Sequence, residues 1–231
     1  MAPSSPVDAV RGFKGLSFLR SHFRVRFRRD AFERRGYFAG SDLRRESELN
    51  AALADPEVKA VLALRGGVGA SRFVGRANFE LLRSQPKWLV GFSDITALHL
   101  ESTRLSVASL HGPHVASLGR CDSRAERELL STLRAPTARR DFALRALAAG
   151  TAVGRLWGGN LAIVHDAAAA GRLAPPAQGI LFLEDVGERP YRIDRMLTAL
   201  IVGGHLRSVC GVVLGDFTDC RPGPDGITVE Q

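Results

Sequence analysis

Ser93 stands at an abrupt change of sequence pattern, where its hydroxyl group could act as a nucleophile. The apolar run Trp88–Val90 ends at Gly91-Phe92-Ser93-Asp94, and a helical pattern begins immediately afterwards. A serine on such a strand-to-helix turn lies at the carboxyl edge of the sheet, near the first amides of the helix. That position suits acyl transfer, but a serine there can equally serve only as a helix cap. This segment alone leaves both interpretations open.

A glycine-rich loop follows another strand pattern earlier in the chain. Val61–Leu64 is typical of a buried strand and leads into Arg65–Arg72, in which three glycines allow tight turns and close approach of a ligand. Amides freed in such a loop could bind an anion. The loop matches a dinucleotide-binding fingerprint only in part, because Arg72 replaces the third glycine of G-x-G-x-x-G. A plain tight turn is the other alternative.

Two adjacent carboxylates end a third strand pattern. Ile180–Leu183 leads directly into Glu184 and Asp185. A carboxylate at the end of a buried strand can hold an imidazole in one tautomer and stabilise its cation. The alternative for Glu184 is helix capping or a surface ion pair with Arg189 or Arg192.

Alternating strand and helix patterns predict the elements that position these residues. In the first part of the chain we predict helices over 11–21, 41–54, 71–83, 94–104 and 124–133, an extended segment over 23–27, and strands over 60–64, 88–92 and 106–110. We place an N-terminal nucleophile domain at 1–134, a linker at 135–152, and a smaller, incomplete α/β domain at 153–231. In that domain we predict helices over 160–169 and 191–202 and strands over 180–183 and 211–214. This alternation predicts an α/β fold with a doubly wound parallel sheet and a site at the strand carboxyl ends.

The composition argues against several classes of protein. With 231 residues, of which 45% are hydrophobic, the chain can bury a substantial core. No apolar run reaches the length of about 18 residues that a membrane span needs, and Met1–Asp8 lacks the pattern of a signal peptide. We therefore expect a cytoplasmic protein without a membrane partner. Cys121, Cys210 and Cys220 are odd in number and lack C-x-x-C spacing, so neither a disulfide framework nor a metal or other cofactor is expected.

The formal net charge of +8 comes almost entirely from arginine. The densest basic cluster, Phe23–Arg29, alternates apolar and basic residues, which favours a strand with one solvent-exposed face. A nucleic-acid surface with interleaved aromatic residues is the alternative. No helix-turn-helix, zinc-finger or RNP-like pattern supports it, so we expect no nucleic-acid partner.

Six segments resemble the LD-carboxypeptidases, which are serine peptidases that include the muramoyl-tetrapeptide carboxypeptidases and the microcin C self-immunity peptidases. They occur in the family's order: ALRGGVGASRF, WLVGFSDITALH, HGPHVASLG, GRLWGGNLAIV, ILFLEDVGERPYRIDRML and GVVLGDFTDC. Each segment alone is a modest signal, but six in order with compatible spacing are specific. The resemblance extends from about Ala2 to the last residue.

The resemblance implies a role for several residues. Ser93 falls on the nucleophile and Glu184 on the acid of the catalytic triad, and the backbone N–H groups of Gly67 and Asp94 would form the oxyanion hole. The implied activity is release of a terminal D-amino acid, such as D-Ala, from murein tetrapeptides in peptidoglycan recycling. A murein-derived peptide is then the substrate, and a homodimer is one assembly that stays open. Candidates for binding the free carboxylate of the peptide are Arg65, His111 and, in the Gly158-Gly159-Asn160 turn, Asn160.

The triad histidine of the family has no match in this chain. The family carries it in a Gly-His turn downstream of the GVVLGDFTDC strand, so we expect a C-terminally truncated fragment with little or no peptidase activity of its own. His111 is the nearest substitute, whereas we expect structural or solvated roles for the histidines at 22, 99, 165 and 205. The start is also short, because Ala2-Pro3-Ser4 resembles the end of the family's first strand. The other functions kept open are a microcin-type amide hydrolase, an inactive peptide-binding relative, and a nucleotide-binding α/β protein that uses the glycine loop.

Overall fold

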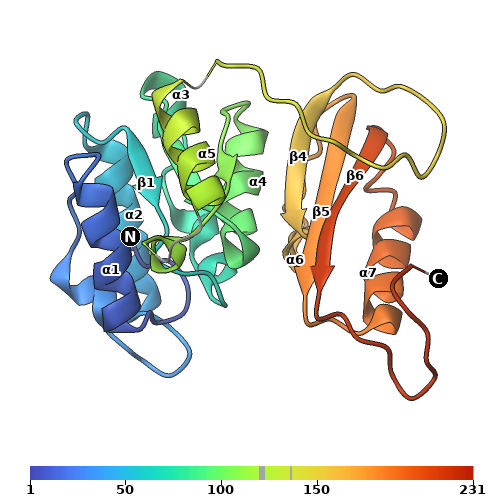
Figure 1. Ribbon diagram of the computed structural model, residues 1–231, viewed down its shortest axis with the longest axis horizontal. Coiled ribbons are helices and arrows are strands. Elements are labelled where there is room, and N and C mark those ends of the chain that lie inside the picture. Colours follow the sequence, from blue (N-terminus) through green and yellow to red (C-terminus); the bar gives the residue numbers. More distant parts are fainter. Residues whose placement is uncertain (120–122, 136, 231) are drawn as a thin grey trace.

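The computed structural model describes residues 1–119, 123–135 and 137–230, so Cys121, Pro136 and Gln231 lie outside the described residues. Two parallel three-stranded sheets organise the described chain (Figure 1), and in each the strands follow one another in sequence order. The first contains β1 (Ala60–Leu62), β2 (Trp88–Gly91) and β3 (Leu110–His111). The second contains β4 (Arg155–Asn160), β5 (Gly179–Val186) and β6 (Val209–Thr218). The predicted α/β class with parallel strands and two domains is therefore confirmed.

Helices cover both sides of the first sheet (Figure 1). They are α1 (Ala9–Arg20), α2 (Asp42–Ala54), α3 (Leu81–Ser84), α4 (Thr96–Arg104) and α5 (Ser123–Arg134). The start of α2 follows from Ser41, whose hydroxyl accepts a hydrogen bond from the Arg44 N–H at 3.2 Å. Its end follows from Pro56, because a proline disfavours helical backbone angles at the residue before it, here Asp55.

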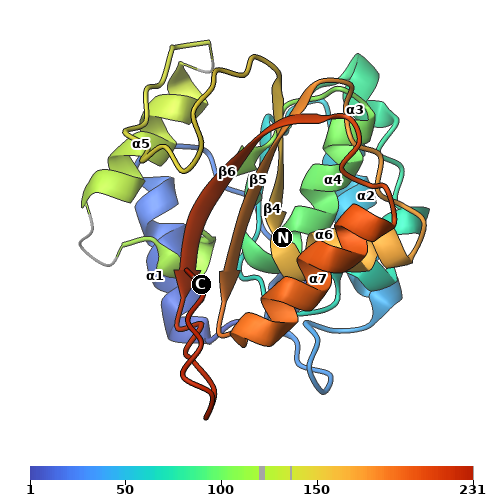
Figure 2. The ribbon, with the colours of Figure 1, turned by 90° about the vertical axis from the view of Figure 1, so that its right-hand side faces the viewer.

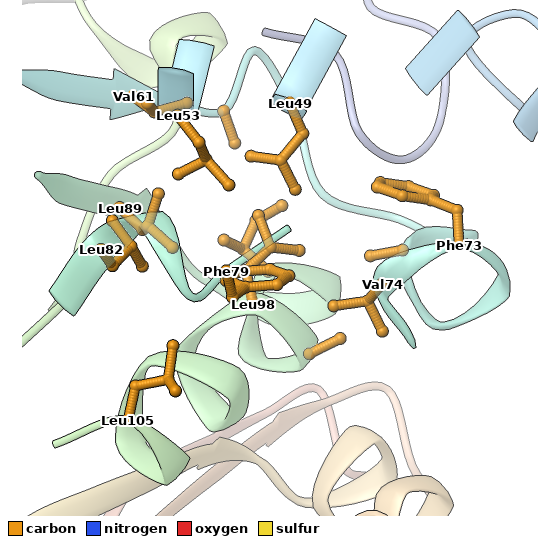
Figure 3. Close-up of a cluster of buried hydrophobic side chains, with 14 residues drawn as sticks. Leu49, Leu53, Val61, Phe73, Val74, Phe79, Leu82, Leu89, Leu98 and Leu105 are labelled. Atoms are coloured by element: carbon orange, nitrogen blue, oxygen red, sulfur yellow. The ribbon is translucent and has the colours of Figure 1, made fainter. Parts of the chain in front are cut away.

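The core of the N-terminal domain lies between α2, the sheet and α4 (Figure 3). Leu49 and Leu53 on α2, Leu89 on β2 and Leu98 on α4 are each at most 2% exposed. Each such side chain contributes roughly 1.5–3 kcal/mol by its removal from water. The burial therefore fixes β2, and with it the segment after β2, against two helices.

Two predicted elements in this domain are wrong in type or length. The predicted helix over 71–83 is instead two short 3₁₀ turns, Ala70–Arg72 and Val74–Arg76, followed by α3. The chain bends here because Phe73 and Phe79 are both buried in the core, and because the side chain of Asn50 binds the Asn78 N–H at 2.8 Å. These contacts between distant segments replace the regular helix.

The predicted strand over 106–110 is wrong in length, because the structure has only the two-residue strand β3, Leu110–His111. The end of α4 curls back instead, because Ser106 has a positive φ of 59° and the Val107 N–H donates to Ser102 O at 2.9 Å. The segment 23–27 does alternate between half-buried and exposed residues, as predicted, but it forms no strand within the described part of the chain.

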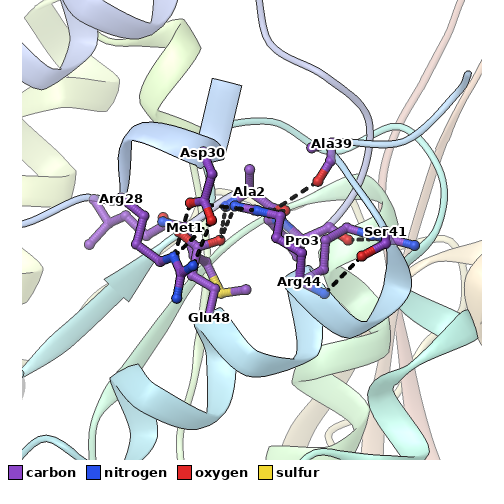
Figure 4. A network of polar contacts seen from close by, with 11 residues as sticks. Met1, Ala2, Pro3, Arg28, Asp30, Ala39, Ser41, Arg44 and Glu48 are labelled. Atoms are coloured by element: carbon purple, nitrogen blue, oxygen red, sulfur yellow. Dashed lines mark hydrogen bonds and ion pairs between the residues drawn. The ribbon is translucent and has the colours of Figure 1, made fainter. Parts of the chain in front are cut away.

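The first residues of the chain run beside β1 and are tied to α2 (Figure 4). The Met1 ammonium donates to Leu62 O at 2.9 Å, and the Leu64 N–H donates to Met1 O at 2.7 Å. These two bonds have the pattern of parallel strand pairing. The Glu48 carboxylate accepts from the Ala2 N–H at 2.9 Å and from Arg44 Nη2 at 2.7 Å. The segment is thereby anchored next to the glycine loop.

The second sheet packs its helices, α6 (Leu161–Ala169) and α7 (Pro190–Val202), on one face (Figure 2). Its core includes Trp157, Leu181 and Leu183, and it also takes in Leu100 from α4 of the first domain. Glu101 on α4 forms an ion pair with Arg172 of the second domain. Residues 137–154 form neither helix nor strand and are exposed. The domain boundaries at 134 and 153 stay a prediction.

Candidate active site

Ser93 lies on a strained bend directly after β2. Its φ is +59°, in the left-handed region that non-glycine residues rarely adopt. Such a conformation costs on the order of 1–3 kcal/mol, and strain of this kind clusters at functional sites. Ser93 opens the 3₁₀ turn Ser93–Ile95, whose N-cap is Phe92, and no side-chain capping bond is made there. The alternative in which Ser93 serves only as a helix cap is therefore wrong.

The glycine loop lies against this bend. A methyl group built on Gly66 would come within 3.1 Å of Ser93 Cβ, so Gly66 and Ser93 are in close contact. Gly67 and Gly69 have φ values of +110° and +126°, which explains why glycine is needed at both positions. A 3₁₀ turn of three residues follows the loop, rather than the long helix whose N-terminus binds a pyrophosphate in dinucleotide folds. This geometry argues against the nucleotide-binding alternative.

The backbone amides of Gly67 and Asp94 are available for a ligand. Within residues 1–119, 123–135 and 137–230, neither N–H donates to a protein acceptor. The Asp94 side chain, which is 1% exposed, instead accepts a hydrogen bond from the Ala70 N–H at 2.8 Å. Burial raises the pKa of this carboxyl group. The two predicted oxyanion-hole residues therefore lie on segments that are bonded to each other.

Arg45, which the sequence analysis overlooked, supports the glycine loop. Its fully buried guanidinium lies 4.9 Å from the ring centre of Phe38 and 5.2 Å from that of Phe73. It donates to Pro3 O at 2.7 Å and pairs with Asp42. A methyl group on Gly69 would collide with Arg45 Nη1. An arginine within the apolar pattern of α2 is the signal that could have revealed it.

Glu184 and Asp185 face different surroundings at the end of β5. Asp185 is fully engaged, because it accepts hydrogen bonds from Asn160 Nδ2 at 2.9 Å, the Ala162 N–H at 3.1 Å and the Val186 N–H at 2.7 Å. Glu184 is 8% exposed, and within the described chain its Oε1 is buried without a hydrogen-bond partner. Burial, together with the neighbouring Asp185 charge, raises the pKa of Glu184 to about 7. The alternative ion pairs do not form, because Arg192 pairs with Glu188 and Arg189 binds backbone carbonyls.

His111 brings the two domains together at Glu184. Its Nε2 lies 3.9 Å from Glu184 Oε1, and its ring lies 5.1 Å from the ring of Phe182. Burial, followed by the nearby His99 and His114, lowers the pKa of His111 to about 3, so it is neutral at physiological pH. Among the described residues, no histidine nitrogen is hydrogen-bonded to Ser93 Oγ. The structure thus brings an imidazole to the acid but not to the nucleophile.

His99, for which we expect a structural or solvated role, is a further buried histidine of the first domain. His99 is 4% exposed, and its Nε2 lies 2.8 Å from Gly91 O. Burial lowers its pKa to about 4.

The remaining candidates for substrate binding differ in how free their side chains are. Arg65 is exposed at the glycine loop and donates to Pro6 O at 2.9 Å. Asn160 is not part of a free turn, because it ends β4 and caps α6 through a bond from the Ile163 N–H at 3.3 Å. Its own N–H donates to Thr96 Oγ1 at 2.9 Å, three residues after Ser93. Thr96 is a second residue that the sequence analysis missed, because only the fold brings α4 to β4.

A cleft of about 390 Å³ opens beside His111. Its walls are Leu110–Pro113, one side of α5, and residues 139–142. Within the part of the chain that the structure describes, no group of three or more histidine, cysteine or carboxylate residues could hold a metal ion. Among the helices of residues 1–119, 123–135 and 137–230, none has the length and hydrophobicity of a membrane-spanning segment.

The fold and this arrangement define a two-domain α/β protein with a serine on a strained elbow. Family models agree: the LD-carboxypeptidase N-terminal domain matches residues 1–112, and the LD-carboxypeptidase C-terminal domain matches residues 153–231. The chain therefore belongs to the LD-carboxypeptidase family.

Individual relatives carry related names. A putative carboxypeptidase of Streptomyces coelicolor is 42% identical over 96% of this chain and 75% of its own length. A probable murein peptide carboxypeptidase of Bacillus subtilis is 33% identical over 96% of this chain and 72% of its own length. The crystal structure of muramoyltetrapeptide carboxypeptidase from Oxalobacter formigenes matches with a TM-score of 0.87 and 27% identity, over 100% of this chain and 80% of that one. These relatives support a peptidase of the carboxypeptidase type.

Proposed function

We propose that this protein is a serine-type LD-carboxypeptidase that releases a terminal D-amino acid, such as D-Ala, from murein tetrapeptides. The observation that carries the proposal is the left-handed conformation of Ser93 in contact with the glycine loop. This strained conformation costs stability, but it lifts the serine hydroxyl out of the strand toward a ligand, as a nucleophile requires. The relatives named for murein peptides support the substrate class.

In the proposed reaction, Ser93 Oγ attacks the carbonyl carbon of the last peptide bond while an imidazole accepts its proton. The amides of Gly67 and Asp94 stabilise the oxyanion, and each such donor is worth roughly a hundred- to a thousand-fold in rate. The imidazolium then protonates the leaving amine, which departs as the free D-amino acid. Water, deprotonated by the same imidazole, hydrolyses the acyl-serine ester and restores the enzyme.

Glu184 is the proposed acid that orients the imidazole. Its Oε1 is buried without a partner in the described chain, and an imidazole N–H would supply that missing hydrogen bond. Pairing with an imidazolium would also favour the ionised carboxylate and lower the raised pKa. Asp185 is a poor alternative, because its oxygens already accept three hydrogen bonds.

Two histidines are candidates for the imidazole of this mechanism. The family resemblance implies a histidine downstream of β6, and His111 is the alternative within this chain. Because no described histidine is bonded to Ser93, we propose that residues 1–231 alone have little or no activity. The cleft beside His111 is the proposed place for the rest of the peptide, and Arg65 for its carboxylate. Location in the cytoplasm and a role in peptidoglycan recycling complete the proposal.

The test measures D-Ala release from a murein tetrapeptide by residues 1–231 and by a chain that continues through the family's histidine. Ser93→Ala should lower the rate of the longer chain by about a thousand-fold or more while the protein stays folded. Near-normal turnover by the Ser93→Ala variant would refute the nucleophile. Equal turnover by both chains, abolished by His111→Ala, would make His111 the base. Hydrolysis of aminoacyl amides but not of tetrapeptides would favour the microcin-type alternative.

A further inference from the structure

His114 touches both segments that carry the proposed oxyanion hole. It lies in the loop after β3 and is 5% exposed. Its ring stacks on Phe92, with 4.1 Å between ring centres and an interplanar angle of 19°. Its Nε2 lies 2.9 Å from Phe92 O and 3.3 Å from Phe92 N, and its Nδ1 accepts from the Gly66 N–H at 3.4 Å. The neutral tautomer with the proton on Nε2 donates to Phe92 O, the shorter of the two contacts at Nε2, and accepts from the Gly66 N–H at Nδ1.

The two residues that His114 binds are direct neighbours of the proposed machinery. Gly66 precedes Gly67, and Phe92 precedes Ser93. At the other end of the glycine loop, the Asp94 carboxylate accepts from the Ala70 N–H at 2.8 Å. The loop is thus fastened to the elbow at residues 66 and 70, with Gly67 between the two attachment points.

The packing around the first attachment leaves no room for adjustment. A methyl group on Gly66 would come within 2.8 Å of His114 Cε1 and 3.1 Å of Ser93 Cβ. The imidazole therefore acts as a spacer that sets how closely the loop approaches Ser93. Burial lowers the pKa of His114 to about 4, so at neutral pH the ring keeps the unprotonated Nδ1 that accepts the Gly66 N–H.

We infer that His114 is a positioning residue that, together with Asp94, clamps the glycine loop to the nucleophile elbow and fixes the amides of Gly67 and Asp94 relative to Ser93. The clamp itself follows from contacts in the structure, and its consequence for catalysis rests on the proposed function. An oxyanion hole acts only if its donors are fixed before the reaction. Loosening the clamp should therefore slow the chemical step and leave substrate binding nearly unchanged.

The deciding variant is His114→Phe, which keeps a ring to stack on Phe92 and removes both hydrogen bonds. His165→Phe, on the surface of α6, is the matched control. Amide hydrogen exchange measures the clamp and needs no enzymatic activity. Loss of a protecting hydrogen bond should make exchange at residues 66–70 at least about tenfold faster in His114→Phe, and His165→Phe should leave it unchanged. In a chain that continues through the family's histidine, phosphonylation of Ser93 by a fluorophosphonate measures the oxyanion hole, and it should slow by about tenfold or more in His114→Phe. In an active preparation kcat should fall in parallel, with KM changed less than about twofold.

The possible outcomes separate the clamp from the proposed function. Unchanged exchange at residues 66–70 would overturn the clamp. Faster exchange with unchanged labelling and kcat would overturn its role in positioning. If fluorophosphonate does not label the wild-type chain that continues through the family's histidine, this counts against Ser93 as nucleophile, while the exchange result still decides the clamp. If His114→Phe does not fold, His114→Asn replaces it, because the asparagine carbonyl can take the place of Nδ1 as the acceptor. The exchange rate at residues 66–70 should then lie between those of wild type and a protein without the clamp. A rate equal to that of wild type would refute the contribution of the bond to Phe92 O.

Discussion

The buried carboxyl group of Glu184 leads to a prediction in which stability and activity change in opposite directions. Its pKa moves from 4.5 to about 7 on folding, because burial and the Asp185 charge disfavour the ionised form. Such a shift opposes folding by roughly 3 kcal/mol once the group is ionised in both states. Glutamine has the same shape and cannot ionise, so Glu184→Gln should stabilise the protein at alkaline pH.

The sign and the pH window follow from the two pKa values. Below pH 4.5 the carboxyl is protonated in the folded and the unfolded chain, and the penalty is absent. Between 4.5 and about 7 only the unfolded chain releases this proton, so the contribution of Glu184 to stability falls as the pH rises. Above about 7 the penalty is complete and constant. His111, whose pKa falls from 6.5 to about 3 on folding, adds its own pH dependence to stability in this window. Wild type and Glu184→Gln both carry this histidine, so its effect cancels when the two proteins are compared.

The assay is urea unfolding of wild type and Glu184→Gln at about pH 4.5 and about pH 8.5, with the free energy of unfolding taken from linear extrapolation. The gain from the substitution should be near zero at the lower pH and up to roughly 3 kcal/mol at the higher pH. Glu80→Gln is the control, since that side chain is 58% exposed and should give the same small difference at both pH values. Turnover by Glu184→Gln should fall sharply even as stability rises. A stability difference that does not depend on pH would refute the burial of this carboxyl group.

Three further substitutions test the geometry of the elbow. In the chain that continues through the family's histidine, Gly66→Ala should slow labelling of Ser93 by about tenfold or more, because its methyl group would lie 3.1 Å from Ser93 Cβ. Gly112→Ala meets only contacts of 3.6 Å or more and should leave the labelling rate unchanged. Equal rates for the two variants would contradict the close approach. Ser93→Gly should be more stable than Ser93→Ala by about 1 kcal/mol, because only glycine adopts the φ of +59° without strain. At Ser102 in the helix α4, the alanine variant should instead be more stable than the glycine variant. Thermal melts in which glycine and alanine rank in the same order at both positions would argue against a strained elbow. Thr96→Val should lower the free energy of unfolding, measured in urea, by about 1–3 kcal/mol, because it leaves the buried Asn160 N–H of the second domain without its acceptor. An unchanged midpoint of unfolding would mean that this bond between the domains does not contribute to stability.

Local patterns in the sequence were enough to predict β2, β5 and α2, whereas no strand was predicted where β4 lies. β2 and β5 are short apolar runs that end at polar residues, and both strands occur where such runs predict them. The helix at 42–54 likewise has its cap and its stop written into adjacent residues, Ser41 and Pro56. These features depend on neighbours within a few residues, which a sequence displays directly.

The errors arose where distant contacts decide the local conformation. The helical spacing over 71–83 was overridden by burial of Phe73 and Phe79 and by the bond from Asn78 to Asn50. The partners of Asn160 could not be predicted for the same reason, since Asp185 and Thr96 come from other elements. The bonds of His114 to Gly66 and Phe92 also span residues far apart in the chain. No pattern of residue spacing reports such pairings.

The hydrogen bond from the Asn160 N–H to Thr96 Oγ1 joins the two domains one helical turn from Ser93, and Asn160 is also the β4 partner of Glu184. If one domain rotated against the other about this bond, each atom would move in proportion to its distance from the axis. The serine and the carboxylate lie close to such an axis, so their separation would change little. The outer walls, including the exposed strap of residues 137–154, would travel much farther. The bond thus joins the two domains at a point where a relative rotation would disturb the spacing of Ser93 and Glu184 least.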